Sequence, residues 1–200
     1  MPELSLYWPR DLDGYRTEAG KKGRTIAGTS GARIVRNGGK LDYSCDRMKC
    51  AGLYRALAAT PPTPEGALSF VCRYGFLQGQ DSEDVEHICN EIAVANSLLE
   101  HTEDRDALSR WLEENASAMR LTATITKDGL FFRPVSLQSA IYLQFFEDLE
   151  NGAQLRLCKR PGCGTWFKYG PGTGKRNTAQ YCTTKCEKAH NYERSKEKVK

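Results

Sequence analysis

The chain has 200 residues, of which 40% are hydrophobic, and its formal net charge is +4. This length and composition suit one domain with a small appended module, and they exclude a collagen-like or wholly disordered chain. No apolar run approaches the roughly 20 residues that a membrane helix needs, and the first residues do not resemble a signal peptide. We therefore expect a cytoplasmic protein without a membrane partner, whose eight cysteines are reduced.

The charge is distributed unevenly along the chain. Residues 156–200 contain 12 basic and 3 acidic side chains, whereas residues 41–155 contain 9 basic and 18 acidic ones. An acidic body with a basic C-terminal segment is typical of a protein whose C-terminal part contacts nucleic acid while its body does not.

Residues 1–40 are rich in glycine and basic residues, and we expect a poorly defined N-terminal segment there. Strand-like stretches occur at Arg33–Arg36 and Leu41–Tyr43. Residues 41–152 are expected to form a mainly helical body, because apolar residues recur there at helical spacing. The first four predicted helices begin near Leu53, at Thr63, at Asp81 or Ser82, and at Asp104.

Two of these helices have apolar faces that predict buried sides. The second carries Leu68, Val71 and Cys72 on one face, and Gly75 ends it. The stripe of the third consists of Val85, Ile88, Ile92, Ala95 and Leu99.

The period of the apolar residues then changes from 3.6 to 2. Leu121, Ala123 and Ile125 alternate with threonines, and an Asp-Gly pair at 128–129 separates them from a second apolar run. This pattern predicts a β-hairpin. Ser136 then caps a last body helix, which ends at residue 152. The predicted fold class is a mainly α body with one hairpin (α+β), followed over residues 153–200 by a C-terminal module.

Four cysteines of this module have the spacing of a zinc site. They form two close pairs separated by 18 residues: Cys158 with Cys163, and Cys182 with Cys186. Zinc takes four soft or borderline ligands at tetrahedral corners, and two close pairs joined by a hairpin can supply them. The order of turn, hairpin and helix predicts a treble-clef zinc finger with one structural Zn²⁺. His190 stays open as a replacement ligand, because it follows Cys186 by four residues on a predicted helix.

The module also resembles the zinc finger of a bacterial family. Residues 158–167 read CKRPGCGTWF and residues 181–186 read YCTTKC, which is similar to CGNR-type proteins. These carry an N-terminal helical domain often called ABATE, which the stretch LSFVCRYGFL at residues 68–77 resembles, and they are regarded as stress-induced transcription regulators. Where that family has Cys-Gly-Asn-Arg, this chain reads Cys-Glu-Lys-Ala at residues 186–189, so it lies near the family rather than inside it. The resemblance implies nucleic-acid binding.

Basic residues of the module are the candidate nucleic-acid contacts, because lysine and arginine neutralise phosphate charge. Lys175 and Arg176 lie at the predicted hairpin tip, and Arg194, Lys196 and Lys198 lie on the C-terminal helix. The sequence therefore predicts a zinc-dependent nucleic-acid-binding protein, a bacterial transcription regulator that contacts the DNA backbone. A homodimer through the helical body stays open.

Two other functions stay open. One is a protein-interaction adaptor whose zinc finger is purely structural, and the remote one is a metal-dependent nuclease. We expect no enzyme, because four protein sulfurs leave no open position on the zinc ion. The glycine-rich stretch at residues 170–175 is not a P-loop, since Tyr169 stands where the first glycine belongs and Arg176 follows the lysine.

A second metal site from Cys45, Cys50, Cys72 and Cys89 also stays open. We expect Cys72 to lie in the core instead, because free cysteine is common on apolar helix faces.

Overall fold

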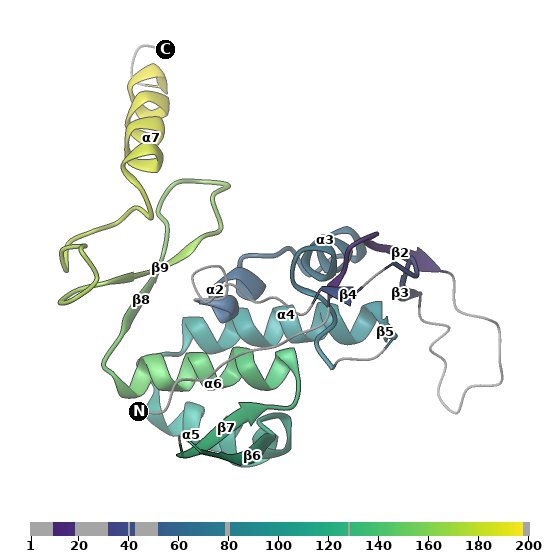
Figure 1. Cartoon of the computed structure of the whole chain (residues 1–200). Coiled ribbons are helices and arrows are strands. Elements are labelled where there is room, and N and C mark those ends of the chain that lie inside the picture. The colour runs from purple at the N-terminus through teal and green to yellow at the C-terminus, as the bar shows by residue number, and fades with distance from the viewer. Residues whose placement is uncertain are drawn as a thin grey trace.

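The computed structural model is a mixed α/β structure, in which helices build the body and the strands form small sheets (Figure 1). It describes the chain in six ranges, which are residues 10–18, 32–39, 41–42, 52–78, 81–127 and 129–197. Helices α4 (Val85–Glu100) and α6 (Leu137–Glu150) lie side by side in the body, and the hydroxyl of Tyr142 on α6 donates to Glu91 on α4.

The remaining body helices are α2 (Leu53–Ala58), α3 (Pro64–Tyr74) and α5 (Arg105–Asn115), which continues into the 3₁₀ turn η1 (Ala116–Ala118). Their starts depend on side-chain caps that satisfy free amides of the first turn. The predicted caps Thr63 and Ser136 are confirmed, since their side chains accept from the amides of Gly66 and Ser139. The helix predicted to begin at about Asp104 is confirmed as well, and Asp104 caps it by accepting from the amide of Ala107.

The predicted start of the third helix at Asp81 or Ser82 is wrong. Ser82–Asp84 instead forms strand β5, which pairs with β3 (Arg33–Arg36), and α4 begins after it with Asp84 as its cap. Strand β3 also pairs with β2 (Tyr15–Glu18), so that three antiparallel strands in the order β2-β3-β5 cover one end of the helices. The helix begins later than predicted because Ser82–Asp84 pairs with a strand that is distant in the sequence, and local spacing cannot predict such pairing.

The N-terminal segment contributes more structure than the sequence predicts. Besides β2 and the confirmed strand β3, the short strands β1 (Arg10–Asp11) and β4 (Leu41–Asp42) pair antiparallel. Asp11 is only 2% exposed, and its carboxylate accepts from the amides of Gly38 and Gly39 at 3.0 and 3.1 Å. This carboxylate therefore holds the turn after β3 against β1.

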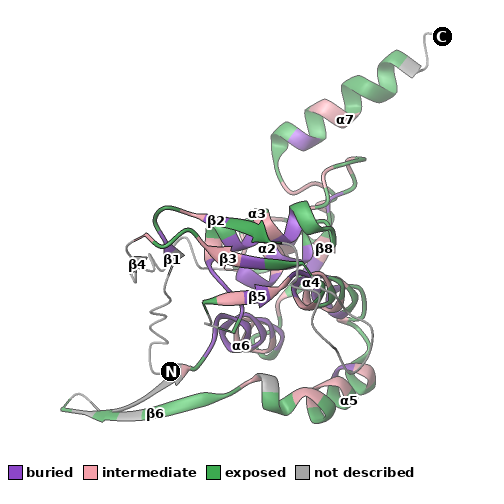
Figure 2. Cartoon of the chain, turned by 90° about the vertical axis from the view of Figure 1, so that its right-hand side faces the viewer, coloured by how far each residue is buried: buried purple, intermediate pink, exposed green. Residues whose placement is uncertain are grey.

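The predicted hairpin is confirmed as β6 (Leu121–Thr126) and β7 (Gly129–Pro134). Its apolar alternation does not mark a buried face, because the side chains of Leu121 and Ile125 are 43% and 83% exposed. Figure 2 shows β6 extending away from the body as an exposed arm. Period-two spacing identifies the strand but leaves open whether anything covers it.

One main hydrophobic core holds the body together, and the predicted stripe on α4 is buried in it. Cys72 does not belong to this core: it is exposed, whereas its neighbour Val71 is fully buried. Over the described ranges, no helix is both long and apolar enough to cross a membrane.

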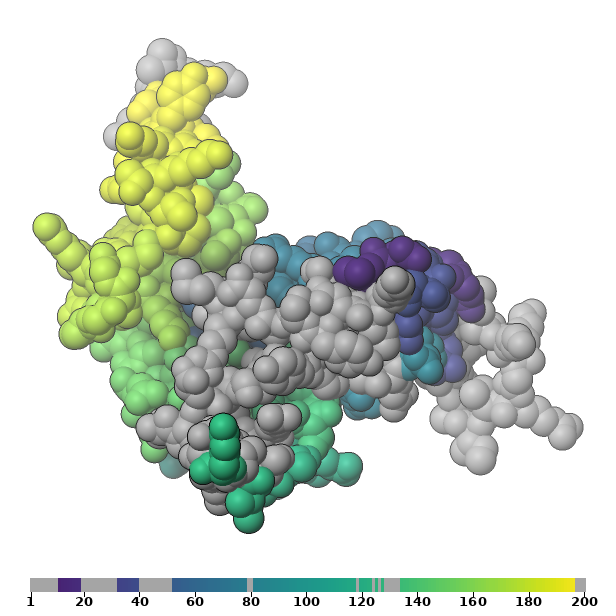
Figure 3. Space-filling view, in the orientation of Figure 1, coloured from purple at the N-terminus to yellow at the C-terminus, as the bar shows by residue number. Residues whose placement is uncertain are grey.

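The C-terminal part consists of the antiparallel strands β8 (Gln154–Leu157) and β9 (Trp166–Tyr169) and of helix α7 (Thr184–Glu197). The space-filling view shows it as a lobe that rises from the body (Figure 3). The boundary at residue 153 stays a prediction; Leu155 and Trp166, which follow it, pack in the core of the body.

Glu83, on strand β5, has a buried carboxylate that contacts the loop after α3. It is 4% exposed, its Oε2 accepts from the amide of Leu77 at 2.8 Å, and its Oε1 lies 3.7 Å from Nε2 of His87. Burial raises the pKa of Glu83 to about 7, and the charge of Glu91 acts in the same direction. Its pKa in the unfolded chain is the lower one, so unfolding releases a proton between about pH 4.5 and 7, and stability is lost as the pH rises through this window.

We predict that Glu83→Gln removes this pH dependence. Between pH 5 and pH 8, the parent should lose up to roughly 3 kcal/mol of unfolding free energy relative to the variant, since one pKa unit corresponds to ~1.4 kcal/mol. Urea unfolding followed by circular dichroism at both pH values measures this. Glu86→Gln, which changes an exposed carboxylate on the first turn of α4, is the control. A parent and a Glu83 variant with parallel pH profiles would contradict the assignment.

Candidate metal centre

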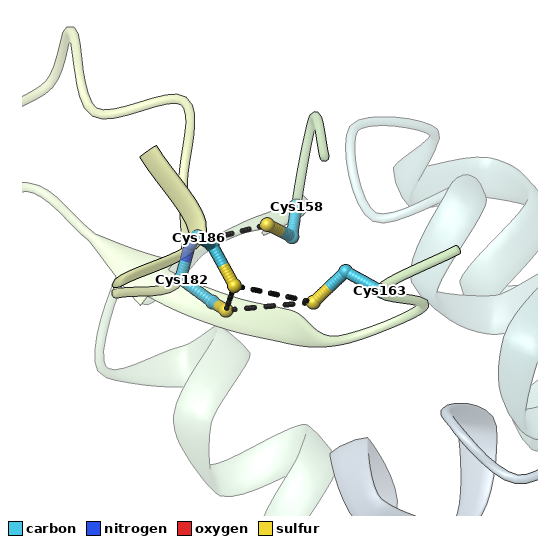
Figure 4. Close-up of side chains that lie close together, drawn as sticks. All are labelled: Cys158, Cys163, Cys182 and Cys186. Carbon is cyan, nitrogen blue, oxygen red and sulfur yellow. Dashed lines mark hydrogen bonds between the residues drawn. The ribbon is translucent and has the colours of Figure 1, made fainter. Parts of the chain in front are cut away.

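The two cysteine pairs meet where helix α7 joins the β8–β9 hairpin (Figure 4). Cys158 and Cys163 lie in the turn between the strands; the amide of Cys158 donates to the carbonyl of Thr165 at 2.9 Å. Glycines with φ of 71° and 61°, Gly162 and Gly164, flank Cys163, because the tight turn uses left-handed backbone that glycine adopts most readily. The second pair spans the start of α7.

The four sulfurs form a compact group. All lie within 4.8 Å of one another, and Sγ of Cys163 is 3.7 Å from Sγ of both Cys182 and Cys186, which are 3.5 Å apart. A tetrahedron with metal–sulfur bonds of about 2.3 Å has edges of about 3.8 Å, close to these spacings. The predicted set Cys158, Cys163, Cys182 and Cys186 can therefore hold one metal ion.

Polar groups around the sulfurs favour their thiolate forms. The side chain of Thr165 lies 3.4 Å from the sulfur of Cys163 and lowers the pKa of Cys163 to about 6. A hydrogen bond with Thr183 lowers the pKa of Cys186, whereas burial raises that of Cys182 to about 12, with the neighbouring sulfurs acting in the same direction. The amide of Cys182 donates to the sulfur of Cys158 at 3.4 Å. A bound cation would stabilise the thiolate form of Cys182 and so offset the effects of burial and of the neighbouring sulfurs on its pKa.

The group of buried residues around the sulfurs is very small. Cys158, Cys186 and Phe167 are its buried members, and a few partly buried residues pack on them. Lys175 helps to close it: its ammonium group donates to the carbonyl of Cys182 at 2.7 Å and lies 5.2 Å from the ring centroid of Phe167. The structure therefore places Lys175, a predicted nucleic-acid contact, inside the module.

The other predicted contacts differ in position. Arg176, Arg194 and Lys196 are exposed, and Lys198 lies outside the described residues. Sequence reasoning missed Arg160, whose guanidinium lies 3.6 Å from a carboxylate oxygen of Glu193 on α7 and helps to lower the pKa of Cys186. Its position between the first two cysteines is the signal that could have identified it.

His190 does not join the sulfurs. Its Nδ1 lies 3.2 Å from the hydroxyl of Tyr181, so it links α7 to the segment that directly precedes Cys182. Within the described ranges, the four cysteines are the one group of three or more metal-ligating side chains that could hold an ion. Cys45 and Cys50 lie outside those ranges.

Two polar contacts fasten the module to the body. The indole Nε1 of Trp166 donates to Oδ1 of Asn96 on α4 at 3.0 Å, and Lys168 pairs with Asp148 on α6 at 2.5 Å. Asn96 carries no signal in the sequence, because an asparagine on a polar helix face looks like any solvated residue. The metal centre is therefore connected to both central helices through strand β9.

Comparisons of the chain with protein-family models, with curated proteins and with solved structures find no match.

We predict that Cys182→Ser unfolds the module while the body stays folded. The body has its own core, whereas the four-cysteine group, which can hold an ion, and Phe167 are the main stabilising elements of the module. Limited proteolysis should cut after residue 158 and leave a resistant fragment that ends near Gly152, with a lower melting temperature because Trp166 leaves the core. Cys72→Ser, at an exposed cysteine outside the cluster, is the control. Digestion of the whole chain at one rate would show a single cooperative unit instead.

Proposed function

We propose that the metal is zinc and that the module is a treble-clef finger. The support is the donor set, since four thiolates in tetrahedral spacing suit Zn²⁺, and the order of elements, in which the β8–β9 hairpin carries the first cysteine pair in its turn and helix α7 begins at the second pair. Four protein sulfurs fill the coordination sphere of the ion, so its role is structural and the protein is not a metalloenzyme.

The expected metal content is about one zinc per chain, because one set of four thiolates is available. Elemental analysis of protein purified without chelator measures it. Protein with Cys163→Ser should retain far less zinc, and Cys89→Ser, at a cysteine outside the cluster, should retain as much as the parent. Two ions per chain would indicate a site at Cys45 and Cys50, and iron in place of zinc would contradict the proposal.

We further propose that the protein binds DNA through helix α7, as a bacterial transcription regulator in the cytoplasm. The observation that carries this proposal is the helix itself, which extends away from the body directly from the metal centre (Figures 1 and 2). From Cys186 onward one side of the helix contacts the module: Cys186 joins the sulfurs, His190 contacts Tyr181, and Glu193 faces Arg160.

A basic stripe open to solvent lies on a neighbouring side of α7, roughly a third of a turn around the helix from the side that contacts the module. The stripe consists of Lys185, Lys188, Tyr192 and Lys196, which follow one another at intervals of three or four residues and so share one side. All four are exposed, Tyr192 by 64%, and the ammonium group of Lys196 lies 4.6 Å from its ring centroid. A helix of 14 residues with a cationic, aromatic side fits the major groove, which is about 12 Å wide.

The charge of the body supports this orientation, because its excess of acidic side chains repels phosphate. An adaptor that binds a protein surface is the competing function. It would not require that three of the cationic residues of α7, Lys185, Lys188 and Lys196, share one exposed side.

We predict that changing Lys185, Lys188 and Lys196 together to Ala weakens binding to duplex DNA. The slope of log affinity against log salt should flatten by up to roughly 3, since each lost phosphate contact contributes about 0.9. Fluorescence anisotropy with labelled duplex at several salt concentrations measures this, with zinc content checked in parallel.

Two controls sharpen the measurement. Arg105→Ala with Arg110→Ala removes two exposed charges from α5 of the body and should leave the slope unchanged. Arg194→Ala tests the side of α7 next to Glu187, away from the stripe. A triple variant that binds DNA with the slope of the parent contradicts the stripe, and a parent that binds no DNA at low salt favours the adaptor.

A further inference from the structure

A polar cavity lies at the other end of the body, where the β6–β7 hairpin joins helix α6. Its volume is about 410 Å³. Four segments line it: the loop after α3, turn η1, the base of the hairpin and the first turn of α6. The lining residues are Gln78, Ser117, Arg120, Val135, Ser136, Gln138 and Ser139.

The volume is that of a ligand site rather than of a packing defect. Pockets for small molecules span about 300–1,000 Å³, and a water molecule occupies about 30 Å³ of liquid, so this cavity exceeds what one or two structural waters fill. Two backbone hydrogen bonds join the segments around it. The amide of Val135 donates to the carbonyl of Arg120 at 3.1 Å, and the amide of Gln138 donates to the carbonyl of Leu77 at 2.9 Å.

The lining consists mostly of polar side chains, three of which are buried. Ser136, Gln138 and Ser139 are 9%, 8% and 1% exposed, although serine and glutamine are usually found at the surface. Val135 is the one apolar residue of the described lining, so the cavity offers little apolar surface to a ligand.

The electrostatics of the cavity favour a negative charge. Arg120 is the charged residue of the described lining, and no carboxylate accompanies it there. The cavity also opens on the N-terminal end of α6, a helix of 14 residues whose dipole adds positive potential at that end. Guanidinium and hydroxyl groups together bind carboxylate and phosphate oxygens.

Two of the residues next to the cavity have partners outside its lining. Nε2 of Gln78 lies 3.2 Å from Nε2 of His87, and the hydroxyl of Tyr142, one turn after Gln138 on α6, donates to Glu91. Glu91 is thus engaged by Tyr142 and is not part of the described lining.

We propose that this cavity binds a metabolite-sized anion, a carboxylate or phosphate compound, with Arg120 as its charge partner. The site is separate from the metal module and does not depend on the function proposed for α7. It gives the body a ligand of its own.

Isothermal titration of the full zinc-loaded chain at constant ionic strength tests the proposal. The probes are succinate, inorganic phosphate and neutral 1,4-butanediol. We expect succinate or phosphate to bind and butanediol not to bind; which anion binds more tightly distinguishes carboxylate from phosphate ligands.

The variant Arg120→Gln should weaken binding of the anion about tenfold or more, since a charge-assisted contact is lost. Arg120 is exposed, so its replacement should leave the fold intact. Arg110→Gln, the same change at an exposed arginine that does not line the cavity, should bind as the parent does. Absence of binding by both anions at millimolar concentration, or equal affinities of the parent and the Arg120 variant, would overturn the proposal.

Discussion

Four sulfurs within 4.8 Å cannot all carry charge unless a cation lies among them, and the C-terminal part of this protein is built around that constraint. Phe167 is the one buried residue of the cluster around the sulfurs that is not a cysteine, so apolar burial supplies little stability there. The hydrogen bond between Cys163 and Thr165 and the one from the amide of Cys182 to Cys158 act on the same sulfurs. The ion would therefore take the place that a hydrophobic core has in a larger domain.

The body and the module meet at strand β9, where one residue packs in the core of the body and the next packs against the sulfurs of the module. Trp166 is buried in the core of the body and donates to Asn96, while the next residue, Phe167, faces the sulfurs. Successive residues of a strand point to opposite sides, so one short strand contributes to both cores. Loss of the metal would release Phe167 first and then weaken the position of Trp166.

Features that depend on neighbours in the chain could be predicted from the sequence. The caps at Thr63, Asp104 and Ser136, the β6–β7 hairpin and the four-cysteine group all follow from spacing over a few residues. Features that depend on distant contacts could not. Strand β5 exists because β3 pairs with it, Lys175 turns inward to reach the carbonyl of Cys182, and Ile125 faces solvent because the hairpin arm leaves the body. The cavity beside α6 needs four segments to be brought together, which no single motif records.

Helix α7 joins the group of sulfurs at Cys186, near its N-terminal end, so a change in the geometry of that group would tilt the helix as a lever. About ten residues separate Cys186 from Lys196, which corresponds to roughly 15 Å along the helix axis. A tilt of about 15° at the metal would displace the far end by about 4 Å, close to the 3.4 Å rise between successive nucleotides of one strand. In the proposed complex with DNA, the coordination geometry of the proposed ion would therefore set the position of the free end of the helix to within about one nucleotide step.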